Sequence, residues 1–96
     1  MIDDLVKDVL ETGEVYKKLI GGFAPATQKI LDNSDKIKAL SNLVKTADVQ
    51  KGFKALRDAG KLKNTFEALI IKHNNLFRKD IVDAAQWRID NANNIK

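Results

Sequence analysis

The sequence predicts an all-α protein that folds as a compact helical bundle of four or five helices. Three observations lead to this prediction. Apolar residues recur at the three- and four-residue spacing of an amphipathic helix along almost the whole chain. No window alternates apolar and polar residues for long enough to predict a strand. The chain has 96 residues, which gives room for one hydrophobic core, so we expect a single helical domain over residues 1–96.

The first helix is expected to begin near the start of the sequence and to end before Gly21-Gly22. Acids crowd its first turn, where the positive end of the helix dipole favours them. Gly13 interrupts the pattern, so either the helix bends there or a neighbouring helix approaches closely. A glycine after the last apolar residue suits the left-handed cap of a helix, and Pro25 suits the first turn of the next one.

A second helix is expected over about residues 25–45. The polar quartet at residues 32–35 interrupts it, because Asp, Asn and Ser side chains compete with the helix for backbone hydrogen bonds. The quartet is either a solvent-facing turn of one continuous helix or a break after which Ser34 caps a new helix. A short third helix then follows and ends at Gly60.

The last apolar stripe is the longest, and it allows one helix over residues 61–93. At 1.5 Å per residue this helix would be about 50 Å long, whereas a chain of this size has an expected radius of gyration of about 13 Å. Asn74-Asn75 is the weak point of the stripe, since Asn favours helix caps over helix interiors. Either the helix breaks near Asn74 and folds back into a compact bundle, or its far half projects and packs on a second copy or another protein.

Charge is distributed unevenly along the chain. Residues 1–35 carry four Lys against seven Asp and Glu, whereas residues 36–79 carry eleven Lys and Arg against three acids, in a chain with a formal net charge of +4. The basic middle is either a footprint for an anionic partner or a surface that the acidic first helix neutralises within the bundle. The sequence leaves both interpretations open.

Few residues are suited to catalysis or metal binding. The chain has no cysteine and a single histidine, His73, in the apolar stripe, so we expect a partly buried side chain that hydrogen-bonds to a neighbour. Asp80, its best partner on the same helix face, lies two turns away, too far to share an ion. Asp4, Asp8 and Glu11 share one helix face, which we interpret as a solvated face. We therefore expect no enzyme activity, no metal and no cofactor.

No segment of the sequence predicts a membrane-spanning helix. The last helix meets the pattern of a lipid-surface helix only partly, because four acids dilute its positive charge: Glu67, Asp80, Asp83 and Asp90. The longest uncharged run, residues 19–28, has ten residues with two glycines and a proline, whereas a spanning helix needs about 20 apolar residues. The first four residues lack the basic and apolar regions of a secretory signal. We therefore expect no membrane partner and a cytoplasmic location.

The leading functional hypothesis is a non-enzymatic protein–protein interaction module. Phe77, Trp87 and Arg88 include the aromatic and Arg types that dominate binding hot spots. We predict that the C-terminal helix, through Phe77, Ile81, Trp87 and Arg88, mediates self-association or the binding or inhibition of a partner protein. Trp87 falls one position away from the main apolar stripe, so the alternative interpretation is that it caps the core of the bundle.

The alternative hypothesis is a basic regulator that binds nucleic acid through a helix-turn-helix-like segment, residues 52–71. The first helix would end at Ala59, Gly60 would form the turn, and the recognition helix would begin at Lys61. Leu56 is bulky where close approach of the two helices favours a small residue, which weakens the match. The candidate nucleic-acid contacts are Lys61, Lys63, Asn64 and Lys72.

Overall fold

Helices follow one another throughout the part of the chain that the structure describes. The structure is a computed structural model that describes residues 2–21, 25–44 and 47–94, and in these ranges it has six α-helices and no strand. The α-helices are α1 (Ile2–Ile20), α2 (Pro25–Asp32), α3 (Lys36–Leu43), α4 (Ala47–Asp58), α5 (Phe66–Lys72) and α6 (Lys79–Asp90). Three short 3₁₀ helices are η1 (Leu62–Asn64), η2 (Asn74–Leu76) and η3 (Ala92–Asn94). The all-α prediction is confirmed, with six α-helices in the described ranges rather than four or five.

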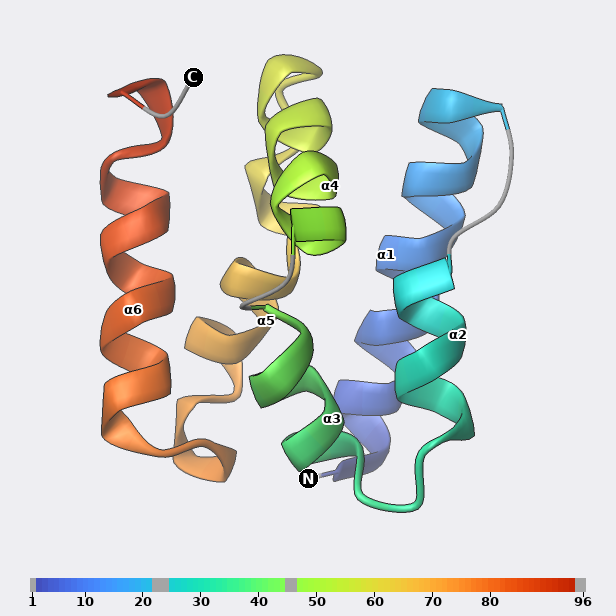
Figure 1. Cartoon of the computed structure of the whole chain (residues 1–96), viewed down its shortest axis with the longest axis vertical. Helices are drawn as coiled ribbons and strands as arrows, with labels where there is room; N and C mark the ends of the chain where they lie inside the picture. Colours follow the sequence, from blue (N-terminus) through green and yellow to red (C-terminus); the bar gives the residue numbers. More distant parts are fainter. Residues whose placement is uncertain (1, 22–24, 45–46, 95–96) are drawn as a thin grey trace.

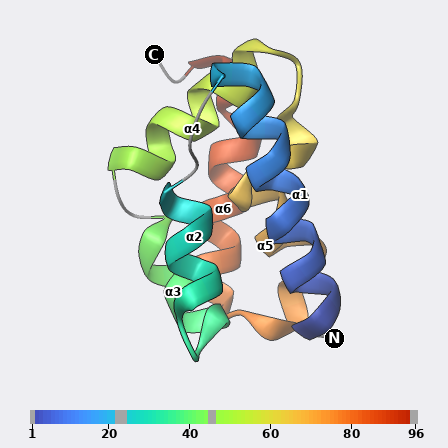
Figure 2. The same ribbon diagram turned by 90° about the vertical axis from the view of Figure 1, so that its right-hand side faces the viewer.

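The helices pack around α5. This helix contacts α1, α4 and α6, and Figure 1 shows α6 at one edge of the molecule with α1 and α2 at the opposite edge. A quarter turn places α1 in front of α6 and α4 to one side (Figure 2). The Cα radius of gyration is 12.1 Å and the molecule measures 29 × 27 × 20 Å. The bundle is therefore compact, as predicted.

One apolar core joins the helices. Four of the seven residues of α5 are buried, so this short helix is enclosed on most of its circumference. Burying a large aliphatic or aromatic side chain contributes about 1.5–3 kcal/mol each, so the core supplies the main stabilisation. The core residues are Leu5, Val9, Ile30, Leu40, Val44, Phe66, Leu69, Ile70, Phe77, Ile81 and Ala85, and Phe53 and Leu56 of α4 are also buried.

The polar quartet at residues 32–35 divides the expected second helix into α2 and α3. Asp35 Oδ1 accepts a hydrogen bond of 3.0 Å from the backbone N–H of Lys38, and Asn33 Oδ1 accepts one of 2.9 Å from the N–H of Asp35. These bonds satisfy donors that a helix start leaves unpaired. The N-cap of α3 is therefore Asp35, and our prediction of Ser34 was wrong. Lys45, the predicted end of this segment, lies outside the described residues.

The last apolar stripe is interrupted twice, so of the two alternatives for residues 61–93 the structure has the break near Asn74 and not one continuous helix. Thr65 and Phe77 have extended backbone conformations, and each lies between a 3₁₀ helix and an α-helix. Asn74, the predicted weak point, begins η2, where its side-chain amide donates a hydrogen bond of 3.0 Å to the carbonyl of Ile71. The chain reverses there, and α6 folds back onto α5 instead of projecting.

Two glycines end helices in the left-handed conformation. Gly21 has a φ of 72° and Gly60 a φ of 73°, a region that side chains with a Cβ rarely adopt. After Gly60, the N–H of Lys61 donates to the carbonyl of Leu56 at 2.8 Å, as in a Schellman cap. Both helix ends were predicted at these glycines, and Gly22 lies outside the described residues.

Gly13 allows α1 and α2 to approach closely, one of the two outcomes that we predicted for it. A Cβ atom at Gly13 would lie 2.7 Å from Cγ2 and 2.9 Å from Oγ1 of Thr27. Carbon atoms in contact are normally about 3.5–4.0 Å apart, so no larger residue fits without movement of a helix or of Thr27. The crossing of α1 and α2 is therefore built on this glycine.

Candidate functional site

The four residues predicted to contact a partner lie on α6 or just before it, but two of them belong to the core. Phe77 is 9% exposed and Ile81 is 7% exposed. Ile81 and Ala85, one turn apart, are the buried residues of α6. Phe77 and Ile81 therefore hold α6 against the bundle and are covered in this structure.

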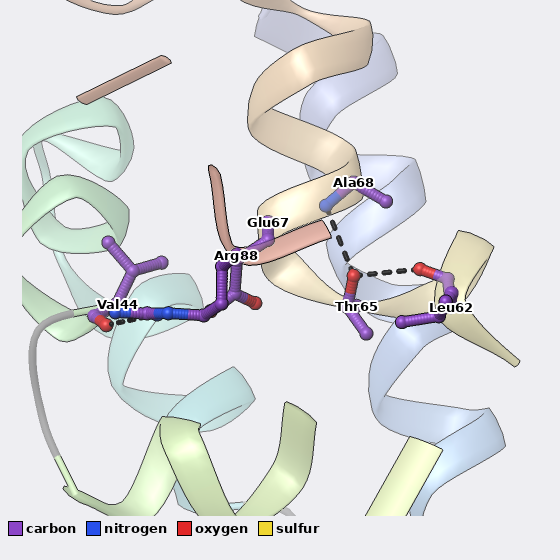
Figure 3. Close-up of polar contacts among 6 residues, drawn as sticks. All are labelled: Val44, Leu62, Thr65, Glu67, Ala68 and Arg88. Atoms are coloured by element: carbon purple, nitrogen blue, oxygen red, sulfur yellow. Dashed lines mark hydrogen bonds and ion pairs between the residues drawn. The ribbon is translucent and has the colours of Figure 1, made fainter. Parts of the chain in front are cut away.

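Arg88 also points inward, where it connects three elements of the fold. Its Nη1 lies 2.5 Å from Oε2 of Glu67 on α5 and donates a bond of 3.0 Å to the carbonyl oxygen of Val44, just after α3. Figure 3 shows the guanidinium extended toward Val44, with Glu67 beside it. Hydrogen bonds between charged groups are shorter and stronger than neutral ones. Arg88 therefore anchors α6 within the molecule.

Glu67 is a buried carboxylate that the sequence analysis did not single out. It is 1% exposed, and burial raises its pKa, although the hydrogen bonds from Arg88 and the backbone, and the charge of Arg88, oppose the rise. Its Oε1 accepts no hydrogen bond from any described residue. A cavity of about 40 Å³, lined by Val44, Glu67, Ile81, Ala84, Ala85 and Arg88, adjoins the pair. This volume is sufficient for a water molecule to reach the carboxylate.

The sequence pattern around Glu67 indicates that this residue is buried. It follows Phe66 directly and precedes Ile70 by three residues, so it falls among apolar positions of one short helix. A charged residue in such a position is rarely buried without a partner of opposite charge. That partner, Arg88, is 21 positions away in the sequence. It could not be identified in advance, because the contact depends on how α6 folds back onto α5.

Trp87 is the one residue of the four that is mainly exposed. Its side chain is on the outer face of α6, and the residue is 61% exposed, the largest value among the exposed large apolar residues. The alternative prediction, that Trp87 caps the core, is therefore wrong. A tryptophan is usually highly buried, and an exposed one marks an interaction surface more often than an exposed aliphatic residue does.

Three aspartates share the outer face of α6 with Trp87. At helical spacing, Asp83 lies one turn before Trp87, Asp90 one turn after it and Asp80 two turns before it, and all three are exposed. Lys79 pairs with Asp83 at 2.8 Å, and Arg78 pairs with Asp80 at 3.2 Å. We call Asp80, Asp83, Trp87 and Asp90 the acidic face of α6.

The predicted recognition helix does not begin at Lys61. Residues 62–64 form η1, and α5 begins only at Phe66, with its buried residues turned toward the core. A recognition helix has to be exposed to enter a groove. Lys63, Asn64 and Lys72 do lie together around a cleft of about 300 Å³, but Asp8, Glu11 and Thr12 of α1 line the same cleft, and Lys61 is not part of it.

The acidic helix α1 and the end of α5 meet at this cleft. Asp8 Oδ2 lies 2.8 Å from Nζ of Lys72 and 2.7 Å from Nε2 of His73, which donates because a carboxylate only accepts. The hydrogen bonds from Lys72 and His73 lower the pKa of Asp8, and the bond to Asp8 raises the pKa of Lys72. His73 is buried and hydrogen-bonded, as predicted, although its partner is Asp8 and not a group on its own helix. The prediction that Asp8 lies on a solvated face was wrong.

This arrangement of α1 and α5 also bears on the uneven charge distribution. The Asp8–Lys72 pair is an instance of the first helix neutralising part of the basic middle within the bundle.

Among the described residues, no three His, Cys, Asp or Glu side chains are placed to hold a metal ion together. Within the same ranges, no helix has both the length and the apolar character needed to cross a membrane.

Fold and surface define a class of protein: a small all-α bundle with a buried Glu–Arg pair and an exposed tryptophan on its last α-helix. Comparison with known proteins does not narrow this class. The chain matches no known protein family, and neither a characterised protein nor a solved structure is significantly similar to it.

Proposed function

We propose that this protein is a non-enzymatic protein-binding module that contacts its partner through the acidic face of α6, with Trp87 at the centre of the contact. The observation that carries the proposal is the 61% exposure of Trp87. A tryptophan side chain buries roughly 150–250 Å² when it is covered, at about 25 cal/mol per Å². An anchor of this kind surrounded by polar residues is the usual composition of a binding hot spot.

Photo-crosslinking from this face tests the proposal. A benzophenone amino acid replaces Ala84, an exposed residue one turn before Trp87 on α6, in one variant, and Leu10, an exposed apolar residue of α1, in a control variant. Trp87 is kept in both variants. We expect an adduct with a specific protein from position 84 only. We further expect that adduct to disappear when Asp83 and Asp90 are both replaced by Lys. The same adducts from both positions, or none from position 84, would contradict the proposal.

The nucleic-acid hypothesis has weaker support as a second candidate. Lys61 and Lys63 are exposed and form no ion pair with any described residue. Because α5 is buried, the hypothesis is limited to contacts with phosphates, which are independent of sequence. The affinity of such binding falls steeply with salt concentration, so it is tested at low salt. A gel-shift titration at about 50 mM salt that shows no shifted band would exclude the nucleic-acid hypothesis.

We also propose a cytoplasmic location. The composition of the chain, with 31% charged and 44% hydrophobic residues, is that of a soluble globular protein. Fractionation of cells that express the tagged protein tests this location. Recovery of the protein with the membrane fraction, and its release only by detergent, would contradict it.

A further inference from the structure

We infer that the partner of the acidic face of α6 is a second copy of this chain, which docks through a lysine patch on α4 and the turn that follows it. The patch consists of Lys51, Lys54 and Lys61. The inference rests on the proposed function, since it assigns an occupant to the same face.

Lys51 and Lys61 of the lysine patch are exposed, and Lys54 is half-buried. Lys51 and Lys54 lie one turn apart on α4, and Lys61 follows the turn at Gly60. None of the three forms an ion pair with a described residue. Asp58, the one acid between them, lies 2.9 Å from Nε of Arg57, which offsets its charge. The patch is therefore a concentrated positive charge.

The acidic face offers one carboxylate without a described cation, beside a ring that binds cations. Asp80 and Asp83 are already paired with Arg78 and Lys79. Trp87 is flanked by Asp83 and Asp90, one turn away on either side. Asp90 accepts a hydrogen bond of 2.8 Å from Gln86, a neutral side chain, and no described cation pairs with it. A Lys ammonium over the face of a tryptophan is stabilised by about 0.5–1 kcal/mol at an exposed site. A lysine of a second copy would find the indole and a carboxylate together here.

The two surfaces are not paired with each other within one molecule. In Figure 1, α4 stands beside α6, and Arg57 of α4 donates a hydrogen bond of 2.8 Å to the carbonyl of Ala92, just after α6. No described ion pair joins the lysine patch to the acidic face. The contact between copies is therefore head-to-tail, with different surfaces on the two partners. A helix of this length spans only about 18 Å, so the buried area is small and the association is weak and sensitive to salt.

Charge reversal on the two surfaces tests the inference. One variant is Asp83→Lys with Asp90→Lys, and the other is Lys51→Glu with Lys54→Glu. Sedimentation velocity at about 20 mM and about 500 mM salt measures association, because screening is strong at the higher value. We expect the unmodified chain to associate at low salt and to return to monomer at high salt. Each variant alone stays monomeric, and an equimolar mixture of the two associates again.

A control variant separates surface complementarity from net charge. Glu14→Lys with Asp32→Lys changes the formal charge by the same amount as the acidic-face variant, at exposed positions of α1 and α2. We expect it to associate like the unmodified chain. A monomeric unmodified chain at low salt, a mixture that does not associate, or equal loss in the control would each overturn the inference. If a different protein is still crosslinked from position 84, the inference alone fails; if crosslinking fails as well, the proposed function also fails.

Discussion

Arg88 and Glu67 form the ion pair that joins the last α-helix to the centre of the fold. The distance between Nη1 and Oε2 is 2.5 Å, and Glu67 is 1% exposed whereas Arg88 reaches the surface. Removing a carboxylate from water costs several kcal/mol, which a single guanidinium offsets only if the geometry is good. Because the same Nη1 also binds the carbonyl of Val44, one side chain connects the end of α3, α5 and α6.

Loss of Arg88 is expected to destabilise the fold more than loss of the charge on Glu67. Arg88→Ala leaves a buried carboxylate without its cation, a change that typically costs about 3–5 kcal/mol. Glu67→Gln leaves Arg88 able to reach water, so its cost is smaller. The double variant, Glu67→Gln with Arg88→Ala, is expected to recover most of the loss. Urea denaturation of the four proteins measures these free energies, and costs that simply add would contradict the coupling.

The pH dependence of stability tests whether the pKa of Glu67 is raised by burial in the folded state. Burial raises its pKa in the folded state above the usual 4.5. The folded state therefore holds the proton more tightly than the unfolded state, and the resulting stabilisation is complete below the usual pKa. It is lost as pH rises through the folded pKa. The free energy of unfolding, relative to that of Glu67→Gln, is expected to fall as pH rises from the usual pKa of 4.5 through the raised pKa of the folded state. A difference that stays constant or rises with pH would contradict this assignment.

The sequence predicted best those features of the fold that depend on a few neighbouring residues. Local signals performed well: the helical period, the glycines that end α1 and α4, and the weak point at Asn74 are all present in the structure. Each of them depends on a few neighbouring residues. The break at residues 32–35 was left open, because a polar turn on a helix surface and a capped break have the same composition.

The candidate site was predicted less completely, for a physical reason. Phe77, Ile81 and Arg88 were expected to contact a partner, yet all three contribute to the packing of α6 on its own bundle. An aromatic or Arg residue on an amphipathic helix has the same sequence pattern in a core and in an interface. Core and surface residues of α6 are distinguished only by the side on which α5 packs, and Trp87 lies on the opposite, outer side.

Thr65 is expected to be the most important cap of the fold. Its Oγ1 accepts a hydrogen bond of 3.1 Å from the N–H of Ala68 and donates one of 2.7 Å to the carbonyl of Leu62 (Figure 3). Thr65→Ala removes both bonds at a buried position and is expected to cost about 1–2 kcal/mol. Thr65→Ser keeps the hydroxyl and is expected to cost clearly less in thermal or urea unfolding. Equal losses in the two variants would show that the methyl group, and not the cap, is what matters.

Two glycines within helices are expected to respond oppositely to replacement by alanine. At Gly13, overpacking against Thr27 costs about 1–3 kcal/mol, which exceeds the gain in helix propensity of about 1 kcal/mol. Gly52 of α4 is the matched control, because a Cβ there would lie 3.7 Å from the Tyr16 ring, an ordinary contact. Gly52→Ala is therefore expected to stabilise the protein and Gly13→Ala to destabilise it. Adding Thr27→Ala to Gly13→Ala is expected to restore part of the loss, as measured by urea denaturation.

Truncation of the predicted contact residues distinguishes core from surface on α6. Ile81→Ala removes a buried side chain, at an expected cost of about 2–5 kcal/mol, and Phe77→Ala is expected to cost about 3–5 kcal/mol. Trp87→Ala removes the largest side chain of the segment, yet it is expected to change stability by no more than about 0.5 kcal/mol, because the residue is mainly exposed. The free energies of unfolding come from urea titrations followed by circular dichroism, since Trp87 is the single tryptophan. A large loss of stability in Trp87→Ala would show that the indole packs on the bundle, and it would remove the basis for a binding role of this face.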